Sequence, residues 1–258
     1  MGGLLLSKQT IGACALCKNI KKLTFEHIPP RAALNAAPAK PVLIEKLLLS
    51  DNLPWETKGI QYSNLQKGMG LYSICEDCNS LTGGNYGPDY TDFACDIDWF
   101  LSKKDCTLFE GIEIQKLHPL RFIKQVASMF CSINEVDNSE LDDLREFVLN
   151  KNAVGLDKSK YRICMYFTHS VFYKYLPLSQ IVKTSNEIIH ASEISTYPLG
   201  FIMYLYPTPK SNYEGIDITS FADDNYDYEC KLQMPLCVKE VNSVLPLDFR
   251  TKDEIVGV

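Results

Sequence analysis

The sequence predicts an α+β protein: a small metal-bound module at the N-terminus, then a helical segment, then an antiparallel β region. Three observations lead to this prediction. Two C-x2-C pairs lie within the first 78 residues, and helical hydrophobic patterns fill residues 91–151. From residue 161 onward, segments rich in β-branched and aromatic residues are separated by Pro, Gly and Asn. We expect two domains, residues 1–90 and residues 91–258.

The proline and glycine residues in the first 90 residues leave room only for short helices and strands. The stretch ACALCKNIKKLTFEHI (13–28) predicts a cysteine knuckle that leads into a hairpin. PVLIEKLLL (41–49) predicts a short helix or strand within a long insertion. ICEDCNSLTGG (74–84) predicts a second knuckle that starts a short helix, which the paired glycines end.

Helices are expected next, and then strands. TDFACDIDWFLSKK (91–104) and LHPLRFIKQVASMFCSIN (117–134) predict helices, the second largely buried, and SELDDLREFVLNK (139–151) predicts a helix with a serine N-cap. The predicted strands are YRICMYFTH (161–169), EIIHASEIS (187–195), LGFIMYLY (199–206) and YECKLQMPLCVKEV (228–241). We assign the Tyr and Phe side chains of residues 161–206 to the core of this sheet rather than to base stacking.

Length and composition are those of an ordinary globular chain. At 258 residues the chain can bury a normal core without a disulfide framework. The sequence has no positively charged start followed by an apolar stretch and a cleavage site, and no apolar run of about 18 residues. We therefore expect a cytoplasmic protein with no membrane partner.

The net charge of −6 is unevenly distributed. Residues 1–90 hold nine Lys/Arg and seven Asp/Glu, whereas residues 91–258 hold 17 and 25. Residues 1–32 contain a single acidic residue and five basic ones, namely Lys8, Lys18, Lys21, Lys22 and Arg31. From charge alone, this basic surface fits either a small phosphate-facing patch or a solvated hairpin.

Four of the ten cysteines predict a metal site. Cys14 and Cys17 form one C-x2-C pair, and Cys75 and Cys78 form another; in a cytosolic chain this spacing indicates metal binding. The 57 residues between the pairs exceed the ribbon spacing of about 15–20, so chance pairing is the alternative. Four thiolates make a closed tetrahedral zinc site that builds structure and leaves no position for substrate. The other six cysteines are dispersed, which is typical of apolar packing.

A carboxylate and an imidazole stand where a short strand must end. In LTFEHIPPRA (23–32), Glu26 and His27 follow a β-prone run and precede two prolines, which cannot continue a helix or a central strand. We expect a return strand to bring this pair back beside the first knuckle, and Asn79 directly follows the second cysteine pair. Carboxylate and amide oxygens suit Mg²⁺, and a neutral imidazole can take a proton from water. The alternatives are purely structural roles: a structural histidine and an asparagine that caps a helix.

Seven residues in this order resemble the motif of the HNH, or ββα-metal, endonucleases. They are Cys14, Cys17, Glu26, His27, Cys75, Cys78 and Asn79. The resemblance covers roughly residues 12–87 and implies an N-terminal zinc-bound ββα-metal module. It implies that His27 is the general base and that Glu26 and Asn79 hold a catalytic Mg²⁺ or Mn²⁺. Arg31 is a candidate to clamp a phosphate, or else the partner of an acidic neighbour.

The chain departs from the family motif at two positions. Glu26 stands where aspartate is commoner, so its carboxylate reaches farther. The middle asparagine of the motif, which orients the general base, has no clean match; Asn64, eleven residues before Cys75, is the candidate. The three histidines outside the motif lack metal-ligand spacing to one another and are expected to be structural or exposed; they are His118, His169 and His190.

The resemblance implies a metal-dependent endonuclease that hydrolyses phosphodiester bonds of DNA and leaves 5′-phosphate and 3′-hydroxyl ends. A role in restriction or antiphage defence is a further hypothesis. The alternative is a catalytically inactive, zinc-scaffolded nucleic-acid-binding or adaptor protein. Because residues 91–258 are acidic, DNA affinity is expected to be weak unless a protein partner delivers the module or a homo-oligomer pairs it.

Overall fold

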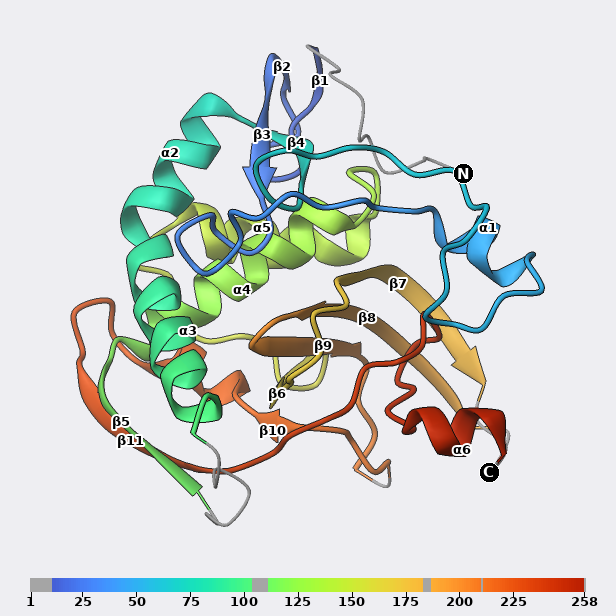
Figure 1. Ribbon diagram of the computed structural model, residues 1–258. Coiled ribbons are helices and arrows are strands. Elements are labelled where there is room, and N and C mark those ends of the chain that lie inside the picture. The colour runs from blue at the N-terminus through green and yellow to red at the C-terminus, as the bar shows by residue number, and fades with distance from the viewer. Residues whose placement is uncertain (1–10, 104–110, 183–186, 210, 258) are drawn as a thin grey trace.

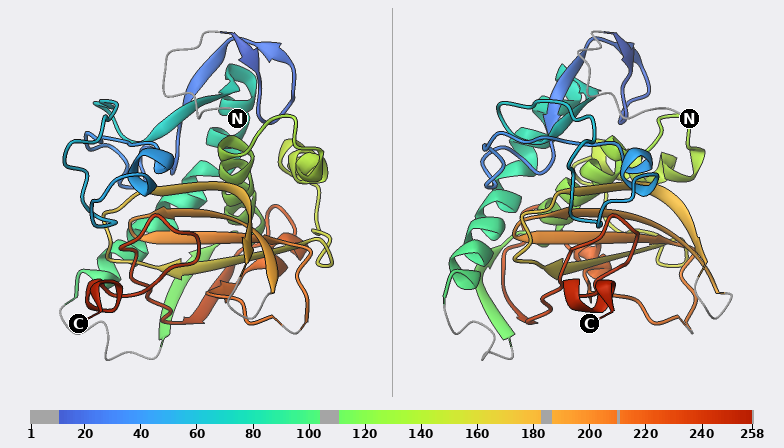
Figure 2. Two further views of the ribbon diagram at one scale, coloured as in Figure 1. Left: turned by 90° about the vertical axis from the view of Figure 1, so that its right-hand side faces the viewer. Right: turned by 45° about the vertical axis from the view of Figure 1, so that its right-hand side comes forward.

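A computed structural model describes residues 11–103, 111–182, 187–209 and 211–257. Within these residues the chain is a mixed α/β protein whose strand pairs are all antiparallel. Figures 1 and 2 show the N-terminal strands at the top, helices in the middle and a five-stranded sheet below. No helix among the described residues is long and apolar enough to cross a membrane.

The N-terminal part contains two small sheets and two helices. In the first sheet β1 (Gly12–Ala13) pairs with β2 (Ile20–Lys21), and in the second β3 (Leu23–His27) pairs with β4 (Gly70–Cys75). Helix α2 (Glu76–Asn85) follows β4 directly, and α1 (Ile44–Leu48) lies in the insertion between β3 and β4. Residues 41–49, expected to form a short helix or strand, contain the helix α1. The hairpin is formed by β1 and β2 around the first knuckle, whereas β3 pairs with the distant β4.

The prediction that Gly83 and Gly84 end the second helix is wrong. Helix α2 continues to Asn85, and α3 (Gly87–Leu101) begins after a break at Tyr86. Each glycine costs a helix about 1 kcal/mol relative to alanine, but tertiary contacts fix both ends of α2. Its first turn carries Cys78, which is packed in the core, and the buried Tyr86 donates its hydroxyl to the Val148 carbonyl over 2.7 Å.

Helix α4 (Pro119–Ile133) lies at the centre of the molecule. Every residue in it except Arg121 is buried, which confirms the prediction of a largely buried helix. It packs against α2, α3 and α5, and it contacts both β4 and the five-stranded sheet (Figure 1). The helix therefore connects the N-terminal strands to the C-terminal sheet.

A short 3-10 helix, η2 (Ser139–Leu141), precedes α5 (Asp142–Leu149). The predicted serine N-cap is wrong by one residue. The side chain of Asn138 accepts a hydrogen bond from the Glu140 backbone N–H over 3.0 Å and so caps the turn. Asparagine caps as well as serine does, and the extra 3-10 turn moves the start of the segment.

The C-terminal sheet has five strands in the order β10-β6-β9-β8-β7. Its strands are β6 (Tyr161–Phe167), β7 (Lys174–Val182), β8 (Ile188–Thr196), β9 (Leu199–Leu205) and β10 (Ile216–Asp217). Three of them confirm predicted strands. The pattern did not indicate β7 because Pro177 interrupts it, and the pairing of β7 with β8 shifts register there, between Leu176 and Ser179.

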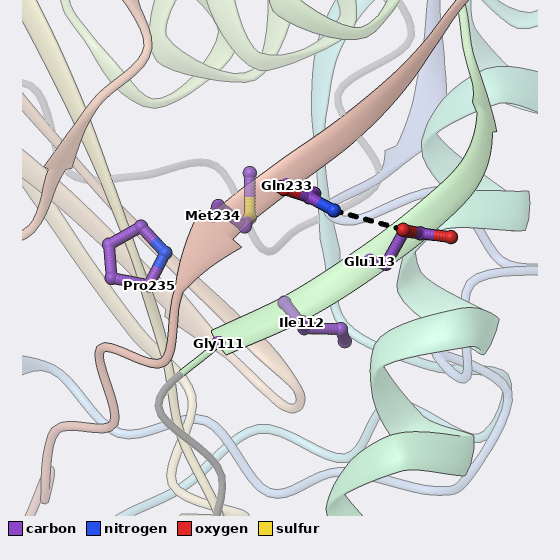
Figure 3. A pocket seen from close by; sticks show the side chains of 6 residues that line it. All are labelled: Gly111, Ile112, Glu113, Gln233, Met234 and Pro235. Carbon is purple, nitrogen blue, oxygen red and sulfur yellow. Dashed lines mark hydrogen bonds between the residues drawn. The ribbon is translucent and has the colours of Figure 1, made fainter.

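Most of the fourth predicted strand lies outside this sheet, and its contact with the sheet is an isolated parallel bridge between Val238 and Phe167 of β6. Its residues form β11 (Cys230–Pro235), which pairs with β5 (Gly111–Leu117), a strand between α3 and α4 that the sequence pattern did not indicate. Figure 3 shows a pocket on this two-stranded sheet of β5 and β11, where Gln233 donates to Glu113 over 3.0 Å. None of the residues that line it is a candidate from the sequence.

Both faces of the five-stranded sheet are covered. Helix α4 packs on one face, and the C-terminal segment around Val241 and Phe249 packs on the other (Figure 2). The remaining elements of the described residues are η3 (Thr219–Asp223) and α6 (Lys252–Val256). The aromatic core prediction is confirmed for Tyr161, Tyr166, Phe167, Tyr175, Phe201 and Tyr204, whereas Tyr206 is exposed.

One continuous core reaches from the N-terminal strands to the C-terminal sheet. It includes Leu23 and Ile74 of the β3–β4 sheet, Phe130 of α4 and Phe201 of β9. A hydrogen bond from the Tyr175 hydroxyl to the Ile28 carbonyl adds a polar link between β7 and the residue directly after β3. The β3–β4 sheet therefore packs against α4 and the C-terminal sheet.

Candidate functional site

The four cysteines of the two C-x2-C pairs form one cluster. Their Sγ atoms all lie within 4.8 Å of one another, and those of Cys17 and Cys75 are 3.9 Å apart. In a tetrahedral site with sulfur about 2.3 Å from zinc, neighbouring sulfurs are about 3.8 Å apart. Cys14, Cys75 and Cys78 are buried, and Cys17 is half-buried. The cluster is positioned to bind a metal ion, and its donor set fits structural zinc.

The first cysteine pair lies in a tight turn between β1 and β2. Lys18 adopts a positive φ of 60°, and its N–H donates to the Cys14 carbonyl over 2.9 Å. The Ala15 N–H donates to the Ser73 carbonyl of β4 over 2.8 Å, and the Cys75 N–H donates to Cys14 Sγ over 3.3 Å. These bonds hold the turn against β4 and bring together two pairs that are far apart in the sequence.

Hydrogen bonding inside the cluster separates the pKa values of its thiols. A hydrogen bond from Cys78 lowers the pKa of Cys14 to about 4, and the same bond, together with burial, raises the pKa of Cys78. Burial is the main cause of the raised pKa of Cys17. Since metals bind thiolates, an incoming ion must displace the protons that the other thiols retain.

Where the structure describes them, the dispersed cysteines and the other histidines take no part in this cluster. Cys131 and Cys164 are buried as predicted, but Cys95 is exposed, and Cys106 lies outside the described residues. His118 is structural: its Nδ1 lies 2.6 Å from a carboxylate oxygen of Asp89.

Four candidate residues line one pocket. Glu26 and His27 come from the end of β3, Arg31 from the turn that follows, and Asn79 from the first turn of α2. Phe25, Pro30, Thr82, Gly83 and Gln125 complete the lining. The structure therefore brings together four candidate residues of which Glu26 and Asn79 lie 53 residues apart in the sequence.

Glu26 and His27 share the β3–β4 sheet with the cysteine cluster but lie at its other end. Leu23 is paired with Cys75, whereas His27 is paired with Gly70. Four residues of strand span roughly 13 Å at about 3.4 Å per residue. The expectation that the pair lies beside the first knuckle is therefore corrected. The strand leads away from the knuckle, which supports the sheet rather than flanking the pair.

Two glycines allow the chain to approach this strand end closely. A Cβ at Gly70 would lie 2.1 Å from the Glu26 carbonyl oxygen and 2.8 Å from the Phe25 ring. Gly68 has a φ of +101°, and a Cβ there would lie 2.1 Å from the Asn35 carbonyl oxygen. Any side chain at either position would push the two segments apart.

Glu26 is a buried carboxyl without a protein partner. It is 4% exposed, and within the described residues its side chain makes no hydrogen bond or salt bridge. Burial, with a smaller effect from the charge of Cys14, raises its pKa to about 8. The carboxyl is therefore protonated at neutral pH when no cation is present. A divalent cation would displace that proton and supply the missing partner.

His27 is held in one tautomer. Its Nε2 lies 2.9 Å from the Lys67 carbonyl oxygen, and because a carbonyl can only accept, Nε2 carries the proton. Nδ1 of the neutral ring therefore keeps its lone pair. Burial, with help from the charge of Arg31, lowers the pKa of His27 below its usual 6.5. The ring is neutral at pH 7 and can accept a proton.

Asn79 is not the N-cap of α2; that position is taken by Cys75, so the capping alternative is wrong. The Asn79 Nδ2 donates to Thr24 Oγ1 over 3.0 Å, and the Thr24 hydroxyl donates its own proton to the Ile74 carbonyl over 2.9 Å. Since Thr24 must accept from Asn79, the amide nitrogen faces β3. The amide oxygen is left for another partner.

Asn35 is a residue that the sequence analysis missed. It is 1% exposed, and its Nδ2 donates to the carbonyls of Pro29 and Met69 over 2.7 and 2.8 Å, while its Oδ1 accepts from the Met69 N–H. It ties the turn after His27 to the chain that enters β4. No motif spacing marks it. Asn64, the candidate for the orienting asparagine, is exposed and does not line the pocket.

No family model, no curated protein and no solved structure matches this chain. The likeness to the HNH motif therefore rests on the residues of the chain itself.

The basic residues of the first 32 residues differ in their partners. Lys18 and Lys21 form salt bridges with Asp142 and Asp77, which fits the solvated-hairpin alternative for these two. Arg31 is exposed and lines the pocket, and within the described part of the chain it forms no salt bridge. Lys8 lies outside the described residues. Arg31 is thus the basic side chain best placed to meet an anion at the pocket.

Proposed function

We propose that this chain is a metal-dependent endonuclease of the HNH type that hydrolyses phosphodiester bonds of DNA. The observation that carries the proposal is the shared pocket of Glu26, His27, Arg31 and Asn79. Oxygen ligands, a neutral imidazole and a free guanidinium are the groups that metal-assisted phosphodiester hydrolysis needs. The cysteine cluster has the structural role, since four thiolates leave no open position on zinc.

Glu26 and Asn79 would hold the catalytic Mg²⁺ or Mn²⁺. Both offer oxygen, which these cations prefer. The Glu26 carboxyl has no protein partner, and the Asn79 amide has its nitrogen engaged by Thr24 and its oxygen left over. A bound divalent cation would stabilise the charge that develops on the phosphate and on the leaving oxygen.

His27 acts as the general base in this proposal. With the proton on Nε2 directed to the Lys67 carbonyl, Nδ1 accepts a proton from the attacking water. Arg31 attracts the phosphate, and its positive charge adds to the effect of burial, which lowers the pKa of His27. The ends expected from the family resemblance are a 5′-phosphate and a 3′-hydroxyl. DNA as substrate, delivery by a protein partner or homo-oligomer, and a role in restriction or antiphage defence stay predictions.

Plasmid cleavage tests the proposal. Zinc-loaded protein is incubated with supercoiled DNA and Mg²⁺ or Mn²⁺, and the wild type is compared with Glu26→Gln. The matched control is Glu76→Gln, because Glu76 is an exposed carboxylate in α2 that does not line the pocket. Cleavage is expected for the wild type and the control and not for Glu26→Gln, with zinc content equal in all three. A folded, zinc-loaded wild type that binds DNA but cleaves no substrate would favour the inactive binding or adaptor protein.

A further inference from the structure

Among the described residues, one that lines the pocket comes from outside the N-terminal 90 residues. This residue is Gln125, in the second turn of the central helix α4. We infer that the side-chain oxygen of Gln125 is a third protein ligand for the divalent cation that Glu26 and Asn79 would hold. The inference rests on the proposed function, because it concerns the same site.

The side-chain amide of Gln125 has a defined orientation. Its Nε2 donates to Ser128 Oγ over 3.3 Å, and the Ser128 hydroxyl donates to the backbone carbonyl of Gln125 over 2.8 Å. Because that hydroxyl proton is already used, Ser128 Oγ faces the amide as an acceptor. The amide nitrogen therefore lies toward Ser128, and the oxygen Oε1 lies on the other side.

The Oε1 of Gln125 is buried without a partner. Gln125 is 1% exposed, and within the described residues no donor reaches this oxygen. A buried acceptor that has lost water and gained no partner is unfavourable, and an ion or an ordered water at the site is one physical reason for such an atom in a folded protein. The other buried side-chain atoms without a partner in the described chain are hydroxyls outside the pocket lining: Ser73, Ser132 and Ser195.

Two lining residues of this pocket therefore carry a partnerless oxygen group, Glu26 and Gln125, and Asn79, whose amide nitrogen is engaged by Thr24, is the third. Oxygen acceptors gathered at one place attract a cation and not an anion. One carboxylate and two neutral amides neutralise half of a divalent charge. Mg²⁺ and Mn²⁺ take six ligands, so this donor set leaves coordination positions for water and for a phosphate oxygen.

The three ligands would come from three elements, β3, α2 and α4. Helix α4 also packs against the five-stranded sheet. The cation would therefore join the N-terminal strands to the central helix. The motif resemblance contains no residue from this helix, so the third ligand is a feature of this chain.

Mn²⁺ binding to the full-length, zinc-loaded protein tests the inference independently of cleavage. Free Mn²⁺ is followed by electron paramagnetic resonance in wild type, Gln125→Leu, Gln125→Glu and the control Ser132→Ala, which removes a partnerless hydroxyl from the same helix outside the pocket. Gln125→Leu is expected to weaken Mn²⁺ binding by about tenfold or more. Gln125→Glu retains an oxygen ligand and should bind at least as tightly as wild type, and Ser132→Ala should bind equally.

Thermal melting separates a ligand from a structural residue. If Gln125 is a ligand, Gln125→Leu melts no lower than wild type without Mn²⁺, since the substitution removes a partnerless acceptor. The rise in Tm that Mn²⁺ produces should then be smaller in the variant. A variant that melts lower without Mn²⁺ but binds Mn²⁺ as wild type does would assign Gln125 a structural role and overturn the inference.

The two proposals can fail separately. If Gln125→Leu binds Mn²⁺ as tightly as wild type while Glu26→Gln loses binding, the inference is overturned and the proposed function stands. If the wild type neither binds Mn²⁺ nor cleaves DNA, both fall. Should Gln125→Leu not fold, Gln125→Met replaces it, and equal Mn²⁺ affinity in Gln125→Met and Gln125→Glu would overturn the inference.

Discussion

Asn79 donates from its amide nitrogen to the hydroxyl of Thr24 over 3.0 Å, and this bond joins the first turn of α2 to β3. The Thr24 hydroxyl in turn donates a hydrogen bond to the Ile74 carbonyl of β4 over 2.9 Å. One hydroxyl thus connects three elements. Because it can only accept from Asn79, it also decides which end of that amide is free to bind a cation.

We predict that Thr24→Val weakens divalent-cation binding and cleavage by about tenfold or more, the effect expected when a group that orients a ligand is lost. Valine has nearly the shape of threonine, so the strand should remain, and zinc content should not change. Thr24→Ser keeps the hydroxyl and should restore most of the activity. The measurements are Mn²⁺ titration, plasmid cleavage and zinc analysis. Wild-type binding and rate in Thr24→Val would show that Asn79 needs no anchor.

One zinc ion per chain is predicted for the purified protein, bound by Cys14, Cys17, Cys75 and Cys78. Binding energies of structural zinc are on the order of 10–16 kcal/mol, so Cys75→Ser should unfold the N-terminal part rather than slow the enzyme. The control is Cys95→Ser, because Cys95 is exposed and outside the cluster. Metal analysis and circular dichroism make the comparison. A folded, active preparation with almost no zinc would contradict the assignment.

Arg145 of α5 is predicted to stabilise the first knuckle through a direct hydrogen bond. It is 2% exposed and donates to the Ala15 carbonyl, between the first two cysteines, over 2.9 Å and to the Glu135 carbonyl over 3.0 Å. Arg145→Met leaves these buried acceptors without a donor, so the free energy of unfolding should fall by roughly 3 kcal/mol or more. Zinc should also dissociate faster. Arg250→Met, at an exposed arginine, should change stability by less than about 0.5 kcal/mol. Urea unfolding distinguishes the two, and equal stability would refute the prediction.

The metal ligands and the pocket residues were predictable because local chemistry marks them. The spacing of the four cysteines signals a common ion, and Glu26 and His27 stand where two prolines end a strand. Once the cysteines share one site, Asn79 must lie near β3. The sequence therefore indicated which residues meet, although it misplaced the pair relative to the knuckle.

Asn35 and Gln125 were not predictable, since each acts through backbone contacts or packing that only the fold creates. Asn35 reaches Met69, 34 residues away, across a breaker-rich insertion. Gln125 follows the pattern of a buried helix, in which a polar residue carries no spacing signal. The strand β7 was missed because Pro177 argues against a strand, and the fold accommodates it with a shift of register.

Gly83 and Gly84 offer a matched pair for testing the pocket. Both lie in α2, and a Cβ on either would meet no atom within 4 Å, but only Gly83 lines the pocket. Alanine at either position should raise stability by up to about 1 kcal/mol through helix propensity. Gly83→Gln should block cleavage by filling the pocket, whereas Gly84→Gln should leave it near wild type. Thermal melting and plasmid cleavage are compared between the variants. Equal activity in the two glutamine variants would show that cleavage does not take place in this pocket.

The pH dependence of cleavage tests the role of His27. Burial and Arg31 lower its pKa, so the ring loses its proton at a lower pH than a free histidine does. If the neutral ring is the base, the rate rises with pH up to a pKa below 6.5 and then levels off. The cation must be saturating, so that Glu26, whose pKa is raised to about 8 without metal, is already deprotonated by the bound ion. A rate that falls as pH rises through this range would exclude a neutral base.

His27→Ala decides between a catalytic and a structural histidine. Loss of a positioned acid–base group should reduce the rate by roughly 10²–10⁴, without a comparable loss of zinc or of DNA binding. A structural histidine would behave in the opposite way, because removing its bond to the Lys67 carbonyl would lower the melting temperature and spare the rate of the molecules that stay folded. Lys67→Ala keeps the carbonyl and is the control for side-chain changes at the partner. A destabilised but fully active His27→Ala variant would show that His27 is a structural residue at the end of β3 and that another group is the general base.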